Sequence, residues 1–90
     1  MFLGRVIGTV WSTKKDENLV GAKFLIVREI SLELKEKDRF VDAVDSVGAG
    51  EGEVVLVATG SSSRMTSFTK DKPVDAVIMG IVDKLDVSDK

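Results

Sequence analysis

The chain has 90 residues, of which 43% are hydrophobic and 31% charged, a composition typical of a folded domain rather than a disordered segment. A domain of this length buries only about 60–65% of its unfolded surface, so its core is thin and contacts between copies would extend it. Cysteine and histidine are absent, which excludes a disulfide framework, a thiol nucleophile and a histidine base. A net charge of −2 without a basic run argues against a nucleic-acid partner.

The N-terminal residues 1–8 contain several apolar side chains and a single charge, Arg5. They lack the basic head, long apolar middle and small-residue cleavage site of a signal peptide. No stretch of the chain approaches the ~20 apolar residues that are needed to span a bilayer. The sequence therefore predicts a cytoplasmic protein without a membrane partner.

The first part of the chain is predicted to form two strands. Residues 2–11 are rich in β-branched and aromatic types, and Gly4 and Gly8 indicate a strand that is bent or closely approached at these glycines, which suits a barrel corner. Residues 12–18 form a polar connection. Residues 19–30 alternate with period two but are apolar on most of both faces. Such a strand is central in its sheet, or is covered on its second face by another subunit.

The middle of the chain adds a hairpin and further strands. Residues 31–39 become purely charged toward their end and are predicted to form a solvated hairpin tip. Residues 40–47 fit one helical face and also a short strand; we predict a strand, because the segment is short and glycines follow it. Residues 53–59 form a buried strand by composition, and residues 74–85 a long final strand. The polar residues 86–90 are a frayed tail.

A small-residue segment, residues 60–67, separates the last two predicted strands. Ser61 or Ser62 is a candidate N-cap for one or two helical turns that carry Arg64 and Met65. The polar run and the proline that follow end this helix.

About five strands and one short helix predict an all-β fold, a small antiparallel β-barrel of the partly open, OB-like kind. We expect one domain over residues 1–85, with the tail of residues 86–90 outside it. The second and last strands carry more apolar side chains on both faces than one small barrel needs. Neighbouring molecules are therefore expected to bury part of the outer surface.

The glycine-rich segment Gly48-Ala-Gly-Glu-Gly resembles half of a dinucleotide-binding fingerprint. Glu53 stands where the third glycine should fall, and a strand follows where that motif needs a helix N-terminus. Glu51 and Glu53 would also repel a phosphate. The segment is therefore interpreted as a turn of glycines with positive φ.

The remaining motifs give little support for a catalytic function. Ser61 to Ser63 lack a histidine base and a Ser-x-x-Lys pattern, so a helix cap with Arg64 held by a carboxylate is the better interpretation. Two pairs of acids could in principle act as general acid and base: Asp42 with Asp45, and Asp71 with Asp75. Nothing in the sequence indicates a pocket beside either pair. We expect no catalytic residue, no cofactor and no metal site.

An OB-fold binding module for single-stranded nucleic acid or oligosaccharide is the alternative function. Such a module presents stacking aromatics on a basic face. Trp11 with Lys14 and Lys15 offers this combination only weakly.

Four segments carry a resemblance to a known family: residues 4–10, 43–53, 60–64 and 73–83. In order and spacing they resemble the bacterial microcompartment vertex proteins, the EutN/CcmL family, over nearly the whole chain. The usual sequence of the serine turn in that family is Gly-Ser-Ser-Ala-Arg, and Ser63 replaces the alanine here. This change should leave the turn intact.

The resemblance implies a non-catalytic structural protein, an OB-like barrel that assembles as a homopentamer at the five-fold corners of a polyhedral shell in the cytoplasm. Its further partners would be the hexameric shell proteins, met by either residues 35–39 or residues 69–72. Several side chains then receive expected roles. Those expected at the ring axis are Gly48, Ala49, Gly50 and Glu51, and those expected at the subunit interface are Ser61, Ser62, Ser63, Arg64, Met65 and Asp75, with Arg64 pairing Asp45 or Asp75.

Overall fold

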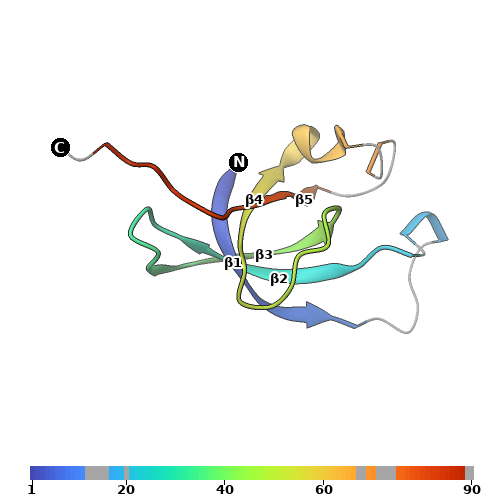
Figure 1. Ribbon diagram of the computed structural model, residues 1–90. Coiled ribbons are helices and arrows are strands. Elements are labelled where there is room, and N and C mark those ends of the chain that lie inside the picture. Colours follow the sequence, from blue (N-terminus) through green and yellow to red (C-terminus); the bar gives the residue numbers. More distant parts are fainter. Residues whose placement is uncertain (12–16, 20, 67–68, 71–74, 89–90) are drawn as a thin grey trace.

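The computed structural model describes residues 1–11, 17–19, 21–66, 69–70 and 75–88. These residues form five strands and two short 3₁₀ helices, whose arrangement is drawn in Figure 1. In chain order the elements are β1 (Phe2–Val10), η1 (Glu17–Leu19), β2 (Phe24–Ile30), β3 (Glu36–Asp45), β4 (Val54–Thr59), η2 (Gly60–Arg64) and β5 (Ala76–Ile81). Within this described part, neither helix is long or apolar enough to cross a membrane.

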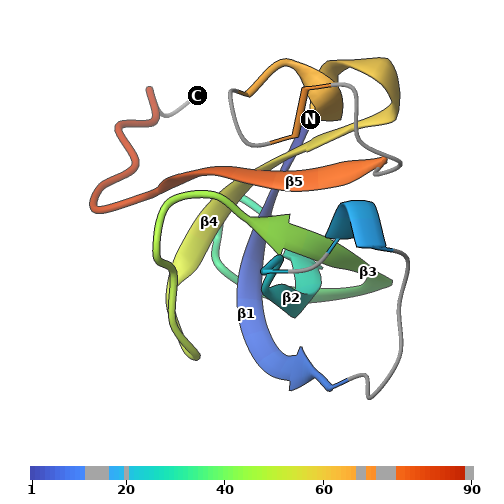
Figure 2. The same cartoon turned by 90° about the vertical axis from the view of Figure 1, so that its right-hand side faces the viewer.

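The strands close into a barrel in the order β1-β2-β3-β5-β4, with β1 pairing again with β4 (Figure 2). This confirms the predicted all-β fold, a small barrel of about five strands; the barrel is closed, where a partly open one was expected. Four of the pairings are antiparallel, and the β3–β5 pairing is parallel. The parallel ladder is short, since it joins only Val44 to Val77 and Asp45 to Ile78 among the described residues.

The barrel interior holds one apolar core, and a smaller cluster lies on the other face of the sheet. Since adjacent residues of a strand face opposite sides, Ala58 and Val77 lie outside the barrel while Val57 and Ile78 lie inside. Ala58 and Val77 are nevertheless fully buried in the second cluster. Part of the outer apolar surface, which the sequence predicted to be buried by neighbouring molecules, is thus covered by the chain itself. The interior core comprises Val6, Leu25, Val27, Ala43, Ala49, Val55, Val57, Ala76 and Ile78.

Strand β3 begins earlier than the sequence pattern predicts. The charged residues 36–39, expected in a solvated tip, are part of the strand. The reason is a set of cross-strand ion pairs: Lys37 Nζ and Arg39 Nη1 lie 3.4 and 3.7 Å from the Glu29 carboxylate on β2. Opposite charges on neighbouring strands stabilise the pairing.

Other element boundaries also differ from the predictions. Strand β2 begins at Phe24, after a helical turn η1 and Gly21, which has φ +89°. Strand β5 ends at Ile81, and the chain continues without regular structure. The predicted helix of the serine segment is the 3₁₀ helix η2, which starts at Gly60 rather than at a serine cap. The predictions for residues 12–16, 20, 67–68, 71–74 and 89–90 lie outside the described residues.

At Gly4, strand β1 lies very close to strand β2. A β-carbon at this position would lie 2.3 Å from Val27 Cγ1 and 2.9 Å from the carbonyl oxygen of Arg28. At Gly4 the structure therefore shows the close approach that was one of the two predicted alternatives, because β1 and β2 come too close for any side chain there. At Gly8 the nearest atom would be Ile26 Cδ1 at 3.5 Å, an ordinary contact.

This difference predicts opposite outcomes for two substitutions in one strand. Gly4→Ala should lower the free energy of unfolding by about 1–3 kcal/mol, since it overpacks the core. Gly8→Ala, the matched control, should be neutral or should stabilise by up to about 1 kcal/mol. Urea unfolding of the two variants beside the wild type measures the difference. Equal stabilities of the two variants would contradict the packing role of Gly4.

Candidate functional site

The glycine-rich corner after β3 is organised by one carboxylate. Asp45 Oδ1 accepts hydrogen bonds from the backbone N–H groups of Val47, Gly48 and Ala49, each at 3.1 Å. The Asp45 side chain is only 3% exposed, and Lys23 Nζ lies 4.0 Å from its other oxygen. Lys23 also donates to the carbonyl oxygen of Ala49 at 3.3 Å. Successive N–H groups around an anion form a nest, here filled by the chain's own carboxylate.

The second half of the corner is held by Glu53 and by β1. Glu53 Oε1 accepts from the Gly50 N–H at 2.6 Å, and the Glu53 N–H donates to the Gly50 carbonyl at 3.1 Å. The Gly52 N–H donates to the Val6 carbonyl at 2.8 Å. Gly48 and Gly52 have φ of +80° and +89°, which confirms the predicted positive φ at these two glycines, whereas Gly50 does not have a positive φ. The corner is therefore a hydrogen-bonded loop with one defined shape.

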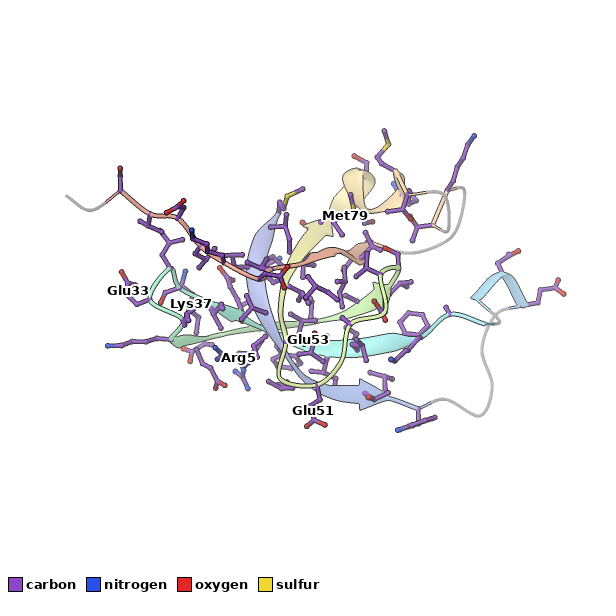
Figure 3. All side chains as sticks on the ribbon, in the orientation of Figure 1. Arg5, Glu33, Lys37, Glu51, Glu53 and Met79 are labelled. Atoms are coloured by element: carbon purple, nitrogen blue, oxygen red, sulfur yellow. The ribbon has the colours of Figure 1, made fainter. Side chains whose placement is uncertain are left out.

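The residues predicted at a ring axis do not all lie on the surface of this corner. Gly48 is exposed, Gly50 is half-buried, and Glu51 is exposed and points away from the barrel (Figure 3). The Ala49 side chain is 1% exposed and belongs to the interior core. At the surface, the corner therefore presents glycine backbone and the carboxylate of Glu51.

Some side chains of the η2 turn are buried and others are exposed. Ser63 is fully buried: its Oγ donates to the Gly60 carbonyl at 2.6 Å, and its own carbonyl accepts from Thr69 Oγ1 at 2.7 Å. Ser63, predicted at the interface, thus stabilises the turn from within, and Thr69 is a buried partner that the sequence pattern did not indicate. The side chain of Ser62 is outside the described part.

Four residues from the predicted interface set are exposed together around this turn: Ser61, Arg64, Met65 and Asp75. Met65 is 79% exposed. The Asp75 carbonyl accepts from the Gly60 N–H at 2.9 Å, which fixes the turn against the start of β5. Arg64 and Asp75 are separate in the sequence but belong to one side of the barrel through this contact.

A polar cleft of about 400 Å³ adjoins Asp75. Its lining includes Arg39 and Asp42 from β3, Thr59 from the end of β4, and Gly60 from the start of η2. Among the described residues, no three acidic side chains lie close enough together to hold a metal ion. The cleft offers charges of both signs and a broad opening, which suits contact with another protein surface more than the chemistry of a small substrate.

The chain matches known sequences and structures along nearly its whole length. Residues 1–83 match the family model described as "Ethanolamine utilisation protein EutN/carboxysome". The bacterial microcompartment shell vertex protein GrpN of Rhodospirillum rubrum is 44% identical over 86 residues, which cover 96% of this chain and 97% of that protein. The vertex protein PduN of Salmonella typhimurium is 46% identical over 89 residues, 94% of this chain and 98% of that protein.

Solved structures show the same fold. A structure described as the GrpN pentameric microcompartment shell protein from Rhodospirillum rubrum superposes with a TM-score of 0.89 at 43% identity, over 98% of this chain and 100% of that one. The structure of Gloeobacter violaceus CcmL gives a TM-score of 0.91 at 41% identity, over 97% and 90% of the two chains. With a family match from residue 1 to residue 83 and these relatives, the chain belongs to the EutN/CcmL family.

Proposed function

We propose that this chain is a structural protein that assembles as a homopentamer and occupies the five-fold vertices of a bacterial microcompartment shell. The observation that carries the proposal is its likeness to the GrpN structure, which is described as pentameric and matches 98% of this chain with a TM-score of 0.89. At 43% identity over the whole domain, the surfaces that build a ring are expected to be shared as well as the fold.

The properties of the chain support a role in assembly. Its thin core would gain from burial between subunits, and large apolar side chains such as Met65 and Leu32 are exposed in the single chain. The corner at Asp45 and the turn at η2 are both fixed by internal hydrogen bonds. A ring closes at five only if the angle between its two heterologous contact surfaces is set by rigid elements.

We place the glycine-rich corner near the ring axis. Gly48 and Gly50 would let several backbones converge, and Glu51 would bring its charge to the opening. Ala49 would take part through its backbone, because its side chain belongs to the core. The alternative of an OB-fold binding module is less well supported, since the relatives named above are vertex proteins.

We place η2 at the subunit interface, with Arg64 paired to a carboxylate of the adjacent subunit. Of the two acids considered from the sequence, Asp75 is the better candidate. Asp45 already accepts three backbone N–H groups and its side chain is 3% exposed, whereas Asp75 is exposed. Ser61 and Met65 would flank this pair.

The remaining partners follow from the same proposal. The ring would contact hexameric shell proteins at its edges, within the shell in the cytoplasm, through either residues 35–39 or residues 69–72. No catalytic role is proposed for any residue. The cleft beside Asp75 would then be a contact surface rather than an active site.

Native mass spectrometry of the purified protein tests the proposed assembly. A dominant closed pentamer is expected at micromolar concentration. A monomer that shifts a labelled single-stranded oligonucleotide, with steep salt dependence, would instead support the binding module and overturn the vertex proposal.

The Arg64 pairing predicts a specific loss of assembly. Arg64→Ala should weaken each interface by about 3–5 kcal/mol if the pair is buried there, since the partner carboxylate is left alone. Lys70→Ala, the matched control, removes a positive charge from an exposed position in the same region and should leave the ring intact. The charge swap Arg64→Asp with Asp75→Arg should restore the ring. An Arg64→Ala ring that persists on dilution would contradict the assignment.

The Asp45 carboxylate predicts coupling between the corner and the ring. Asp45→Ala removes the acceptor of three N–H groups and should cost about 1.5–3 kcal/mol. Hydrogen exchange at Gly48 and Ala49 should accelerate, and the pentamer should dissociate at higher protein concentration than the wild type. Asp38→Ala, at an exposed position of the same strand outside the cleft beside Asp75, is the control. Unchanged exchange at Gly48 in Asp45→Ala would show that the carboxylate does not hold the corner.

A further inference from the structure

The strands of the barrel carry four positive side chains, and two of them have no negative partner. The four are Arg5 on β1, Arg28 on β2, and Lys37 and Arg39 on β3. Lys37 and Arg39 share the carboxylate of Glu29. Neither Arg5 nor Arg28 forms an ion pair with any of the described residues.

The two unpaired arginines lie directly opposite each other on the outer face of the barrel. Arg5 and Arg28 are partners in the β1–β2 register, and Figure 3 labels Arg5 on β1. Their neighbours Val6 and Val27 belong to the interior core, so both arginines point outward. Opposite side chains in an antiparallel pair have β-carbons about 4.5–5.5 Å apart, and like charges there destabilise the pairing. Both residues are half-buried, which weakens the screening of this repulsion by water.

The Arg28 guanidinium is held by hydrogen bonds at Nη1 and unpaired at Nε. Its Nη1 donates to the carbonyl oxygens of Lys37 and Asp38 at 3.4 and 3.2 Å. Its Nε is buried and has no hydrogen-bond partner. Buried donors without an acceptor are rare in proteins, and Nε with Nη2 forms one of the edges on which arginine binds both oxygens of a carboxylate. Arg5 has no hydrogen bond or ion pair that fixes its guanidinium, so it can turn toward an anion at this edge.

An aromatic ring adjoins the two charges. Phe40 lies opposite Arg28 in the β2–β3 register and is 57% exposed. The Arg28 Cζ lies 5.5 Å from the centre of the Phe40 ring, a cation–π contact that supports the guanidinium. Asp38 is exposed and contacts Arg28 through its carbonyl rather than through its carboxylate. We call Arg5, Arg28 and Phe40 the arginine patch.

We propose that Arg5 and Arg28 together bind one carboxylate, with Phe40 packed against the apolar body that carries it. A carboxylate has two oxygens that accept hydrogen bonds, so one such group can bridge both guanidinium groups and offset their repulsion. The planar fork of arginine matches this geometry, which the ammonium group of lysine does not. Either a small organic acid or an acidic side chain of a partner protein can supply the carboxylate. All three residues of the patch come from one chain, so the site does not depend on the proposed pentamer.

Nuclear magnetic resonance of the arginine side-chain N–H groups in ¹⁵N-labelled protein tests the site. The two probes are sodium acetate and the capped dipeptide N-acetyl-Glu-Phe amide, each compared with sodium chloride at equal ionic strength. The Arg28 Nε–H signal is expected to shift with a probe and not with chloride. The Arg39 Nε–H signal is the internal control, because that guanidinium already pairs with Glu29. No shift with either probe at tens of millimolar, or an equal shift of the Arg39 signal, would overturn the proposal.

The two probes also distinguish the sources of the carboxylate. Binding of the dipeptide at least tenfold tighter than acetate would identify an acidic side chain next to an apolar residue, as on a partner protein. Equal binding of the two probes would identify a small organic acid. Both results require the arginine patch.

Substitutions then test which side chains carry the binding. Arg5→Gln and Arg28→Gln should each weaken binding of the tighter probe at least tenfold. Arg39→Gln, the matched control, removes an arginine that already has a carboxylate and should change binding less than twofold. Arg5→Gln should also unfold at the same or a higher urea concentration than the wild type without a probe, because it relieves the repulsion. Unchanged binding in Arg5→Gln and Arg28→Gln, or an equal loss in Arg39→Gln, would contradict the proposal; circular dichroism checks that each variant keeps the barrel.

Discussion

The parallel contact between β3 and β5 is the constraint on which the other features depend. Among the described residues it joins two residue pairs, Val44 with Val77 and Asp45 with Ile78, and it closes the barrel. Ser46 reinforces it, because its Oγ donates to the Ile78 carbonyl at 2.7 Å. At the same point, the Asp45 carboxylate begins the glycine-rich corner. Barrel closure and the shape of the corner are therefore set by three consecutive residues.

The corner also shows why its glycines do not form a phosphate-binding loop. The N–H groups of Val47, Gly48 and Ala49 form the kind of nest that holds phosphates in other proteins. Here the carboxylate of Asp45 occupies the nest, and Glu53 takes the Gly50 N–H. An anion would have to displace an internal carboxylate and approach Glu51. The same groups that appear suited to a ligand instead make the loop rigid.

A rigid barrel with exposed apolar side chains is suited to assembly with other copies of the same chain. The barrel covers part of its outer face with its own chain, as at Ala58 and Val77. It leaves other apolar side chains, including Leu34 and Met79, in water. A protein of this length gains little from a larger core of its own, so burial between copies is the economical source of further stability. Its membership of the EutN/CcmL family is consistent with that physical picture.

Local chemistry in the sequence determined the strand composition, the glycine turn and the small-residue turn, because β-branched alternation and glycine spacing act over a few residues. Only the tertiary structure decided which side chains of those turns face inward. Ala49 and Ser63 have small side chains suited to close contacts at an interface, but barrel closure carries both into the interior. The early start of β3 likewise depends on Glu29 from another strand. Such pairings between distant segments leave no local pattern, since they arise only once the barrel brings the strands together.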